Sequence, residues 1–150
     1  MDTEAARALV DANSYMTLAT ADADGAPWAS PVWFAHEQYA TFFWMSHPGA
    51  RHSRNIAARP EIAIVIFDST VAPDQRNAVY VEATATVVPD AELADAVAVY
   101  AARSVARGLE TLTREDVRGD APWRLYRAYA SAVYVLEDEH DRRVAVQLAR

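Results

Sequence analysis

The chain has 150 residues, and its 14 basic and 21 acidic side chains give a net charge of −7. Non-specific nucleic-acid binding depends on basic groups that contact phosphates, so this charge argues against a nucleic-acid partner. The sequence contains no cysteine, which excludes disulfides, zinc–thiolate sites and iron–sulfur clusters. All 14 basic residues are arginine. Without lysine, a Walker-type phosphate loop and Schiff-base catalysis are excluded as well.

Hydrophobic residues make up 52% of the chain, which is enough for a folded core. The N-terminal segment lacks the apolar stretch of a signal peptide, and no uncharged apolar run approaches the roughly 18 residues of a membrane span. A length near 150 residues is typical of one domain. We therefore expect one cytoplasmic domain over residues 1–150, without membrane association.

The first half of the chain is predicted to contain two short helices, over residues 3–13 and 50–58. The strands predicted between and after them cover residues 15–20, 28–35, 39–46 and 62–67. Pro31 favours an edge position or a bulge for its strand, because proline has no N–H to donate to a neighbour. The continuous apolar run of residues 62–67 predicts a strand buried on both faces.

The second half begins with a predicted strand over residues 79–88 and the longest helix, over 90–107. A polar connection of residues 108–122 leads to two closing strands, over 125–136 and 144–148. Because the strands mostly follow one another instead of alternating with helices, the pattern predicts a mainly β, α+β protein. An antiparallel barrel or sandwich with helical insertions fits this order.

Residues 46–55, Ser-His-Pro-Gly-Ala-Arg-His-Ser-Arg-Asn, carry the most informative polar pattern. They join the end of a predicted strand to the first turn of a helix, where free backbone N–H groups and the helix dipole favour anions. A hydroxyl at Ser46 and the guanidinium of Arg51 add donors suited to a phosphate monoester. An ordinary surface helix explains the same residues equally well.

Aromatic residues gather on the two strands that lead into this segment. On each strand, neighbouring side chains point to opposite faces, so one face can be core while the other forms a slot for a flat ring. The alternative is that most of these rings are core or subunit interface. The six aromatic residues are Trp28, Trp33, Phe34, Phe42, Phe43 and Trp44.

Other polar groups give no pattern typical of catalysis or metal binding. The four histidines have no spacing known for metal ligands, so we expect no metal site. The acidic residues of the segment 137–141 occupy a predicted turn between strands, where a solvated loop is the usual outcome. No catalytic residue can be assigned from the sequence.

Four features of residues 15–67 occur in a distinctive order: a TLAT strand with an Asp-Gly turn, an SPVWF strand, the helix start at residues 46–55, and Arg-Pro-Glu before an apolar strand. This order resembles the pyridoxamine 5′-phosphate oxidase-like family of FMN-binding split barrels. The segments VYVEATATVV and LYRAYASAVYVLED extend the likeness over most of the chain. The resemblance implies an antiparallel split β-barrel with Greek-key connections and two or three short flanking helices. It also implies a homodimer with FMN at the subunit interface.

The resemblance further implies where the flavin ring lies. By position, four consecutive residues match the strand that lines the isoalloxazine, largely through backbone groups. These residues are Ser30, Pro31, Val32 and Trp33.

The phosphate end of the cofactor is implied in the same way. Met45 and Ser46 match the strand end that meets the flavin and its ribityl phosphate, and Asn55 matches a polar position on the following helix. Arg51 and His52 match the basic pair that binds the phosphate. The second position of that pair is commonly lysine, so binding is expected to depend mainly on Arg51 and to weaken as pH rises through the titration of His52.

Near the C-terminus, Arg143 matches an arginine that in the oxidases proper reaches the cofactor or substrate. The longer C-terminal signature of those oxidases is not clear here, so oxidation of pyridoxamine phosphate itself is not expected. The resemblance predicts an FMN-dependent oxidoreductase acting on a small molecule, with NAD(P)H a possible electron donor. Two alternatives remain: an F420-dependent reductase and a non-catalytic flavin-binding or sensing protein on the same fold.

Overall fold

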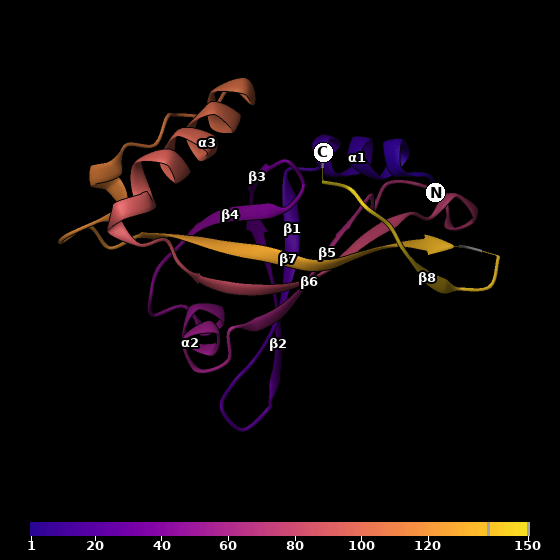
Figure 1. Cartoon of the computed structure of the whole chain (residues 1–150), viewed down its shortest axis with the longest axis horizontal. Helices are drawn as coiled ribbons and strands as arrows, with labels where there is room; N and C mark the ends of the chain where they lie inside the picture. The colour runs from indigo at the N-terminus through magenta and orange to yellow at the C-terminus, as the bar shows by residue number, and fades with distance from the viewer. Residues whose placement is uncertain (138, 150) are drawn as a thin grey trace.

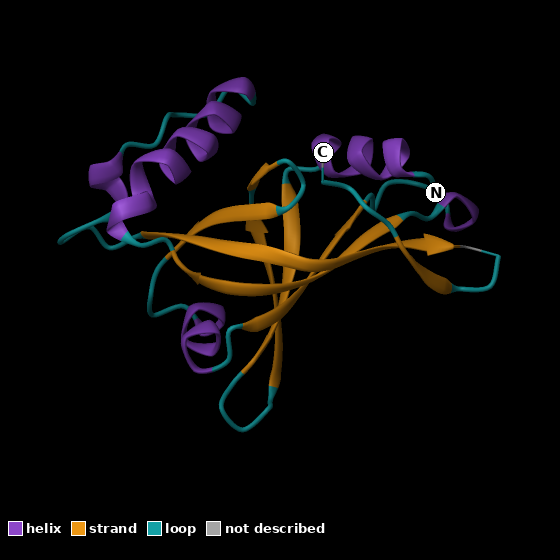
Figure 2. Cartoon of the chain, in the orientation of Figure 1, coloured by secondary structure: helices purple, strands orange, loops and turns teal. Residues whose placement is uncertain are grey.

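The computed structural model describes residues 1–137 and 139–149. Its main feature is one antiparallel sheet of eight strands, curled into a half-barrel (Figures 1 and 2). Along the sheet the order is β2-β1-β5-β6-β7-β4-β3, and β8 pairs with β7. The strands are β1 (Tyr15–Ala21), β2 (Pro27–Trp33), β3 (Ala35–Glu37), β4 (Thr41–Ser46), β5 (Glu61–Phe67), β6 (Ala78–Val87), β7 (Arg124–Glu137) and β8 (Arg142–Ala145).

Three α-helices flank this sheet (Figure 2): α1 (Thr3–Ala12), α2 (Arg51–Ala58) and α3 (Leu93–Ala106). Short 3₁₀ turns lie in the connections: η1 (Pro73–Gln75), η2 (Asp90–Glu92) and η3 (Arg114–Val117). The first helix begins where expected, because the Asp2 carboxylate accepts a hydrogen bond from the Ala5 N–H at 2.8 Å. Within the polar connection of residues 108–122, η3 carries a capping box between Thr113 and Asp116.

The strand connections form a Greek key. β5, β6 and β7 are consecutive antiparallel neighbours, while β4, which precedes β5 in the chain, lies on the far side of β7. The resulting architecture is the split β-barrel with α+β composition and three flanking helices that the sequence predicts. β2 lies at one end of the sheet order, so Pro31 occupies an edge strand as expected.

Two apolar cores lie on opposite sides of β4. Phe42 and Trp44 point into the barrel, where they pack with the inward residues of β1, β5 and β6 and with α1. Phe43 and Met45 point outward, where Phe43 packs with Leu93 and other residues of α3. This alternation confirms that one strand supplies both a core face and a second apolar face.

Three strand predictions need correction. The segment 28–35 is divided into β2, which pairs with β1, and β3, which pairs with β4. The predicted strand 39–46 begins only at residue 41, because Gln38 and Tyr39 form a turn with φ of 51° and 58°. The last strand, predicted at 144–148, is β8 and covers residues 142–145.

The prediction that the strand at residues 62–67 is buried on both faces is wrong within one chain. In β5, Ile62, Ile64 and Ile66 are buried in the barrel, whereas Ala63 and Phe67 are exposed and Val65 is half-buried. The outward face of β5 is open because the helices pack elsewhere. The apolar residues of α1 join the barrel core, α2 lies mainly against β1 and β2, and α3 packs on β3, β4 and β7. The apolar pattern therefore reports a surface that needs a cover, but not what covers it.

Among the described residues, none of the helices has both the length and the apolar character that crossing a bilayer would require.

Candidate functional site

The polar segment 46–55 forms a tight unit between the end of β4 and α2. Ser46 is the last residue of β4, where it pairs with Arg124 of β7, and it is 4% exposed. The turn at residues 47–49 returns the chain so that α2 starts beside Ser46. A Cβ at Gly49 would lie 3.0 Å from Nδ1 of His47, so a larger residue there would require the exposed His47 ring to shift.

A hydrogen-bonded chain of three side chains joins the strand to the helix. The Ser53 hydroxyl donates to Ser46 Oγ at 3.2 Å, and Ser46 Oγ lies 2.7 Å from Nε2 of His52. With Ser53 as donor, the Ser46 hydrogen is free to bond to Nε2, which places the His52 proton on Nδ1. Burial lowers the pKa of His52 below its ordinary value, so the ring is neutral at neutral pH.

The N-terminus of α2 offers unpaired donors. Ala50 is the N-cap, no side chain caps the helix, and there is no acidic residue in its first turn. The first N–H groups of a helix have no partner within the helix, and the dipole adds positive potential there. An anion that bonded to these groups would complete an otherwise uncapped helix.

Arg51 stands at this helix start with its guanidinium carbon 4.4 Å above the Trp28 ring of β2. Its charge contributes to lowering the pKa of Asp22, although the hydrogen bond from the Ala26 N–H is the larger cause. Arg51 is exposed, so its guanidinium remains accessible from solvent. The arginine, the uncapped helix and Ser46 are thus brought together as the sequence predicts.

Asn55 is turned away from this group. Its side-chain amide donates to the Thr20 hydroxyl at 3.0 Å, and both residues are buried. The Thr20 hydroxyl in turn lies 3.3 Å from the Trp28 carbonyl. Asn55 therefore fastens α2 to β1 and β2, a contact that its position in the sequence does not reveal.

The four residues predicted to line a flavin ring lie on β2 with alternating directions. Val32 is buried in the barrel core, while Trp33 points to the outer side and meets Tyr100 of α3 edge-on at 5.0 Å. Ser30 is half-buried and Pro31 is exposed. An edge strand leaves backbone groups of this segment free on one side, as the predicted backbone contacts require.

Trp33 and Met45 share an open groove of about 770 Å³ between α3, the 108–123 connection and the strands. This volume lies within the range of small-molecule sites. The other aromatic residues of the groove are Tyr15, Tyr100 and Trp123. Tyr100 belongs to α3, and the sequence carries no signal that Tyr100 and Trp123 come together at this place.

Arg143 is not brought to this site within one chain. It lies on β8 opposite Leu136, whereas Ser46 lies opposite Arg124 at the other end of β7. At about 3.3 Å per residue, the two positions are roughly 40 Å apart along the strand. The Arg143 guanidinium instead sits 4.7 Å above the Tyr80 ring and pairs with Asp141.

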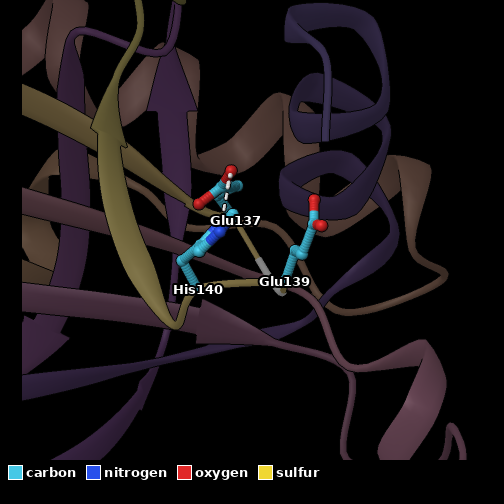
Figure 3. A group of neighbouring side chains, drawn as sticks. All are labelled: Glu137, Glu139 and His140. Carbon is cyan, nitrogen blue, oxygen red and sulfur yellow. Dashed lines mark hydrogen bonds and ion pairs between the residues drawn. The ribbon is translucent and has the colours of Figure 1, made fainter.

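The β7–β8 turn holds a second polar group, Glu137, Glu139 and His140, with ligand-type atoms within 4.8 Å of one another (Figure 3). Both oxygens of Glu137 accept hydrogen bonds from Arg142, at 3.0 and 3.1 Å, and His140 lies 3.4 Å away. This pairing lowers the pKa of Glu137. The described part of the turn is a solvated ion-pair cluster; Asp138, also in the predicted acidic turn, lies outside the described residues.

Comparison with solved structures shows the same fold in several proteins. A heme-binding protein from Mycobacterium smegmatis matches with a TM-score of 0.74 and 22% identity over 97% of this chain, and the chain spans 57% of that protein's length. HutZ, the heme storage protein from Vibrio cholerae, matches with a TM-score of 0.66 and 26% identity over 86% of this chain and 90% of its own. An F420 reductase matches with a TM-score of 0.61 and 22% identity, over 85% and 94% of the two chains.

Among curated proteins, none matches the chain by sequence. The model of the family described as pyridoxamine 5′-phosphate oxidase, in contrast, matches residues 2–137. That span includes strands β1 to β7, together with the helix start at Ser46 and Arg51. The match agrees with the split barrel and its strand order. The chain therefore belongs to the pyridoxamine 5′-phosphate oxidase family.

Proposed function

We propose that the protein is an FMN-dependent oxidoreductase that binds the cofactor phosphate at the start of α2. The observation that carries this proposal is the uncapped helix N-terminus beside an exposed arginine. Met45, which lines an aromatic groove, directly precedes Ser46 in the chain. The donor set fits a phosphate monoester: several N–H groups, the exposed guanidinium of Arg51 and no carboxylate in the first turn. The second arginine of that turn, Arg54, donates to the Gly49 carbonyl.

Within this proposal, Arg51 supplies the charge and His52 does not. The half-buried His52 is neutral at neutral pH, and its Nε2 is already used by Ser46. Its role is to hold the Ser46 hydroxyl and the end of β4 in place. The lysine-free sequence thus binds its phosphate with one arginine and backbone amides.

The remaining predicted residues would position the ring. Trp33 and Met45 form the wall of the groove next to the phosphate site, and the free edge of β2 offers backbone donors and acceptors. When bound, FMN supplies hydride or electron transfer, and the protein supplies orientation and exclusion of water. None of the described groove residues forms an acid–base pair, which agrees with chemistry carried by the cofactor.

We propose further that the chain forms a homodimer through the outer face of β5, β6 and β7. Val65 lies opposite Tyr80, and Tyr80 lies opposite Tyr134, so half-buried apolar side chains form a continuous row across three strands. A row of this kind is typical of an interface. Within one chain, Arg143 lies too far from Ser46 to contact the cofactor. In the proposed dimer, this contact would come from Arg143 of the partner subunit.

A cofactor titration tests the proposed function. Purified protein is mixed under anaerobic conditions with FMN, F420 or haem, and binding is followed by absorbance; NADH and NADPH are then added. We expect FMN to bind most tightly, with bleaching whose rate depends on the nicotinamide concentration. Tighter F420 or haem binding overturns the cofactor assignment, and FMN that no donor reduces favours a passive flavin-binding protein.

The phosphate site is tested by Arg51→Ala, with Arg59→Ala as the matched control at the other end of α2. Arg59 donates to the Ala23 carbonyl and lies away from the helix start. We expect Arg51→Ala to weaken FMN binding by about 1.5–3 kcal/mol, the range for a hydrogen bond to a charged group. Equal affinities of the two variants would show that the phosphate binds elsewhere.

A further inference from the structure

The groove beside the proposed cofactor site extends well beyond the residues predicted to hold a flavin. From Trp33 and Met45 it continues over α3 to the 108–123 connection. Its remaining lining residues are Tyr15, Tyr100, Ser104, Leu109, Glu110, Thr111, Leu112, Glu115, Asp116, Ala121, Pro122 and Trp123. This part of the groove is large enough to select a second molecule.

Aromatic rings define its shape. Trp33 and Tyr100 meet edge-on, with an angle of 69° between their planes, and Tyr100 is 8% exposed. Trp123 and Tyr15 stand more freely at the rim, at 44% and 61% exposure. Flat π surfaces favour planar ligands, and their negative faces attract cations.

The rim that carries Trp123 is held in place by ordinary hydrogen bonds. The Arg124 guanidinium donates to the carbonyls of Gly119, Ala121 and Trp123. The ring of His47 meets Trp123 edge-on at 6.2 Å, which links the rim to the start of α2. The groove is therefore built before a ligand arrives, which lowers the cost of binding.

Its charges have one sign. Glu110, Glu115 and Asp116 line the groove, and none of its lining residues is basic. Arg107 and Arg124, on neighbouring segments, direct their guanidinium groups to backbone carbonyls. A phosphate or carboxylate on the ligand would meet no counter-charge in this part of the groove.

The phenol of Tyr100 adds a polar group at the inner end. Burial, assisted by the neighbouring Tyr15, raises the pKa of Tyr100 to about 12, so the hydroxyl stays protonated at physiological pH. It can donate to a neutral acceptor without adding negative charge.

We propose that this groove binds the substrate of the protein, and that the substrate is a planar aromatic molecule that is cationic or neutral, not anionic. The four aromatic rings of the groove favour a planar molecule, and its three carboxylates disfavour an anion. This inference rests on the proposed function for the reaction itself, but the charge preference of the groove can be measured without it. It argues against a phosphorylated substrate such as the one for which the family is named.

Isothermal titration calorimetry on the FMN-loaded protein tests the inference with three bicyclic probes: N-methylquinolinium, quinoline and 2-naphthoate. We expect the cation to bind at least about tenfold more tightly than 2-naphthoate at neutral pH and low salt, with quinoline between them. Equal or tighter binding of 2-naphthoate overturns the inference.

Variants then locate the preference. Glu110→Gln combined with Glu115→Gln should reduce the affinity for N-methylquinolinium severalfold and leave that for quinoline unchanged. Trp123→Ala should weaken binding of every planar probe. Glu61→Gln combined with Glu4→Gln, an equal charge change at exposed residues outside the groove, should leave the affinities for both probes unchanged. If neither groove variant changes the affinity for the probes, the inference is overturned.

The same titrations on flavin-free protein separate this inference from the proposed function. If the chain takes up no FMN but shows the expected order of probes, the groove assignment holds and the cofactor assignment fails. If FMN binds but the probes show no order of charge, only the groove assignment fails. If FMN displaces a bound probe one for one, the groove is the cofactor site, and the substrate inference is overturned.

Discussion

The outer surface of the sheet is covered on one side and open on the other. Over β4 and the start of β7, α3 packs onto Phe43, which is only 5% exposed (Figure 1). Over β5, the corresponding outward residues include Phe67, which is 47% exposed. Both strands read as apolar in the sequence. The difference shows that apolar character predicts a surface to be covered, whereas only the tertiary structure shows whether the chain covers it itself.

The proposed site lies beside the covered side. Met45 follows the covered Phe43 and Trp44 on β4, and Trp33 meets α3 through Tyr100. The polar unit of Ser46 and His52 follows directly where β4 ends. The covered side thus supplies a rigid wall, and the open side supplies the surface that we propose for a second copy.

The largest expected effect is a difference in the free energy of unfolding between two phenylalanine variants, one on each face. Phe43→Ala removes a buried side chain and should lower the free energy of unfolding by about 3–5 kcal/mol. Phe67→Ala should change it by no more than about 1 kcal/mol at a protein concentration where the chain is monomeric. Urea unfolding measures both. Equal losses would mean that the faces do not differ as the structure shows.

The second prediction concerns the open face as an interface. Val65→Arg places a charge in the centre of the proposed contact and should raise the dimer dissociation constant by at least tenfold, which is 1.4 kcal/mol. Val105→Arg makes the same change on α3, where the valine is 62% exposed. Analytical ultracentrifugation compares them. A dimer that survives Val65→Arg, or that Val105→Arg disrupts, argues against this interface.

A third, smaller effect shows whether Asn55 contributes to FMN binding or to the stability of the fold. Because its amide is buried against the Thr20 hydroxyl, Asn55→Ala should cost about 1–3 kcal/mol of stability. FMN affinity, measured on the folded variant, should stay within about twofold of that of the original chain. Loss of FMN binding without loss of stability would restore Asn55 to the cofactor site.

The smallest expected effect is the acid response of the two half-buried histidines. Burial lowers the pKa of His52 and of His36, although Asp11 partly opposes the shift at His36. The unfolded chain therefore binds more protons, and stability falls as pH drops below the ordinary value of 6.5. Urea unfolding between pH 7 and 4.5 should show a shallower fall in His52→Asn than in the original chain. An unchanged slope would contradict the buried, neutral ring.

This direction also revises the expected pH dependence of cofactor binding. The sequence predicts weaker binding as pH rises through the titration of His52. Because the ring is already neutral at neutral pH, a change in its charge is expected only on the acid side of 6.5. Above neutral pH, binding should depend on Arg51 alone.

Much of the fold follows from local patterns. Asp2 caps the first helix, Pro31 lies on an edge strand, and alternation on β4 separates two apolar faces. These features depend on a few neighbouring residues, so the sequence shows them. The division of residues 28–35 depends instead on two distant partners, because β2 pairs with β1 whereas β3 pairs with β4.

The candidate site divides in the same way. Ser46, Arg51 and His52 are close in the chain, and a single turn is enough to bring them together. Tyr100 and Trp123 reach the groove only because α3 and the loop after it fold back onto the barrel. Their types and spacing carry no sign of that return.

By itself the sequence determined the chemistry that is excluded, the family resemblance, and the polar unit at the start of α2, because composition and short-range order decide these. The tertiary structure alone decided that His52 is neutral at neutral pH, that Asn55 bonds to Thr20, that Arg143 lies far from Ser46 within one chain, and that three carboxylates and four aromatic rings share one groove. Each of these depends on burial or on contacts between distant segments. Such properties arise only when the strands and helices are assembled.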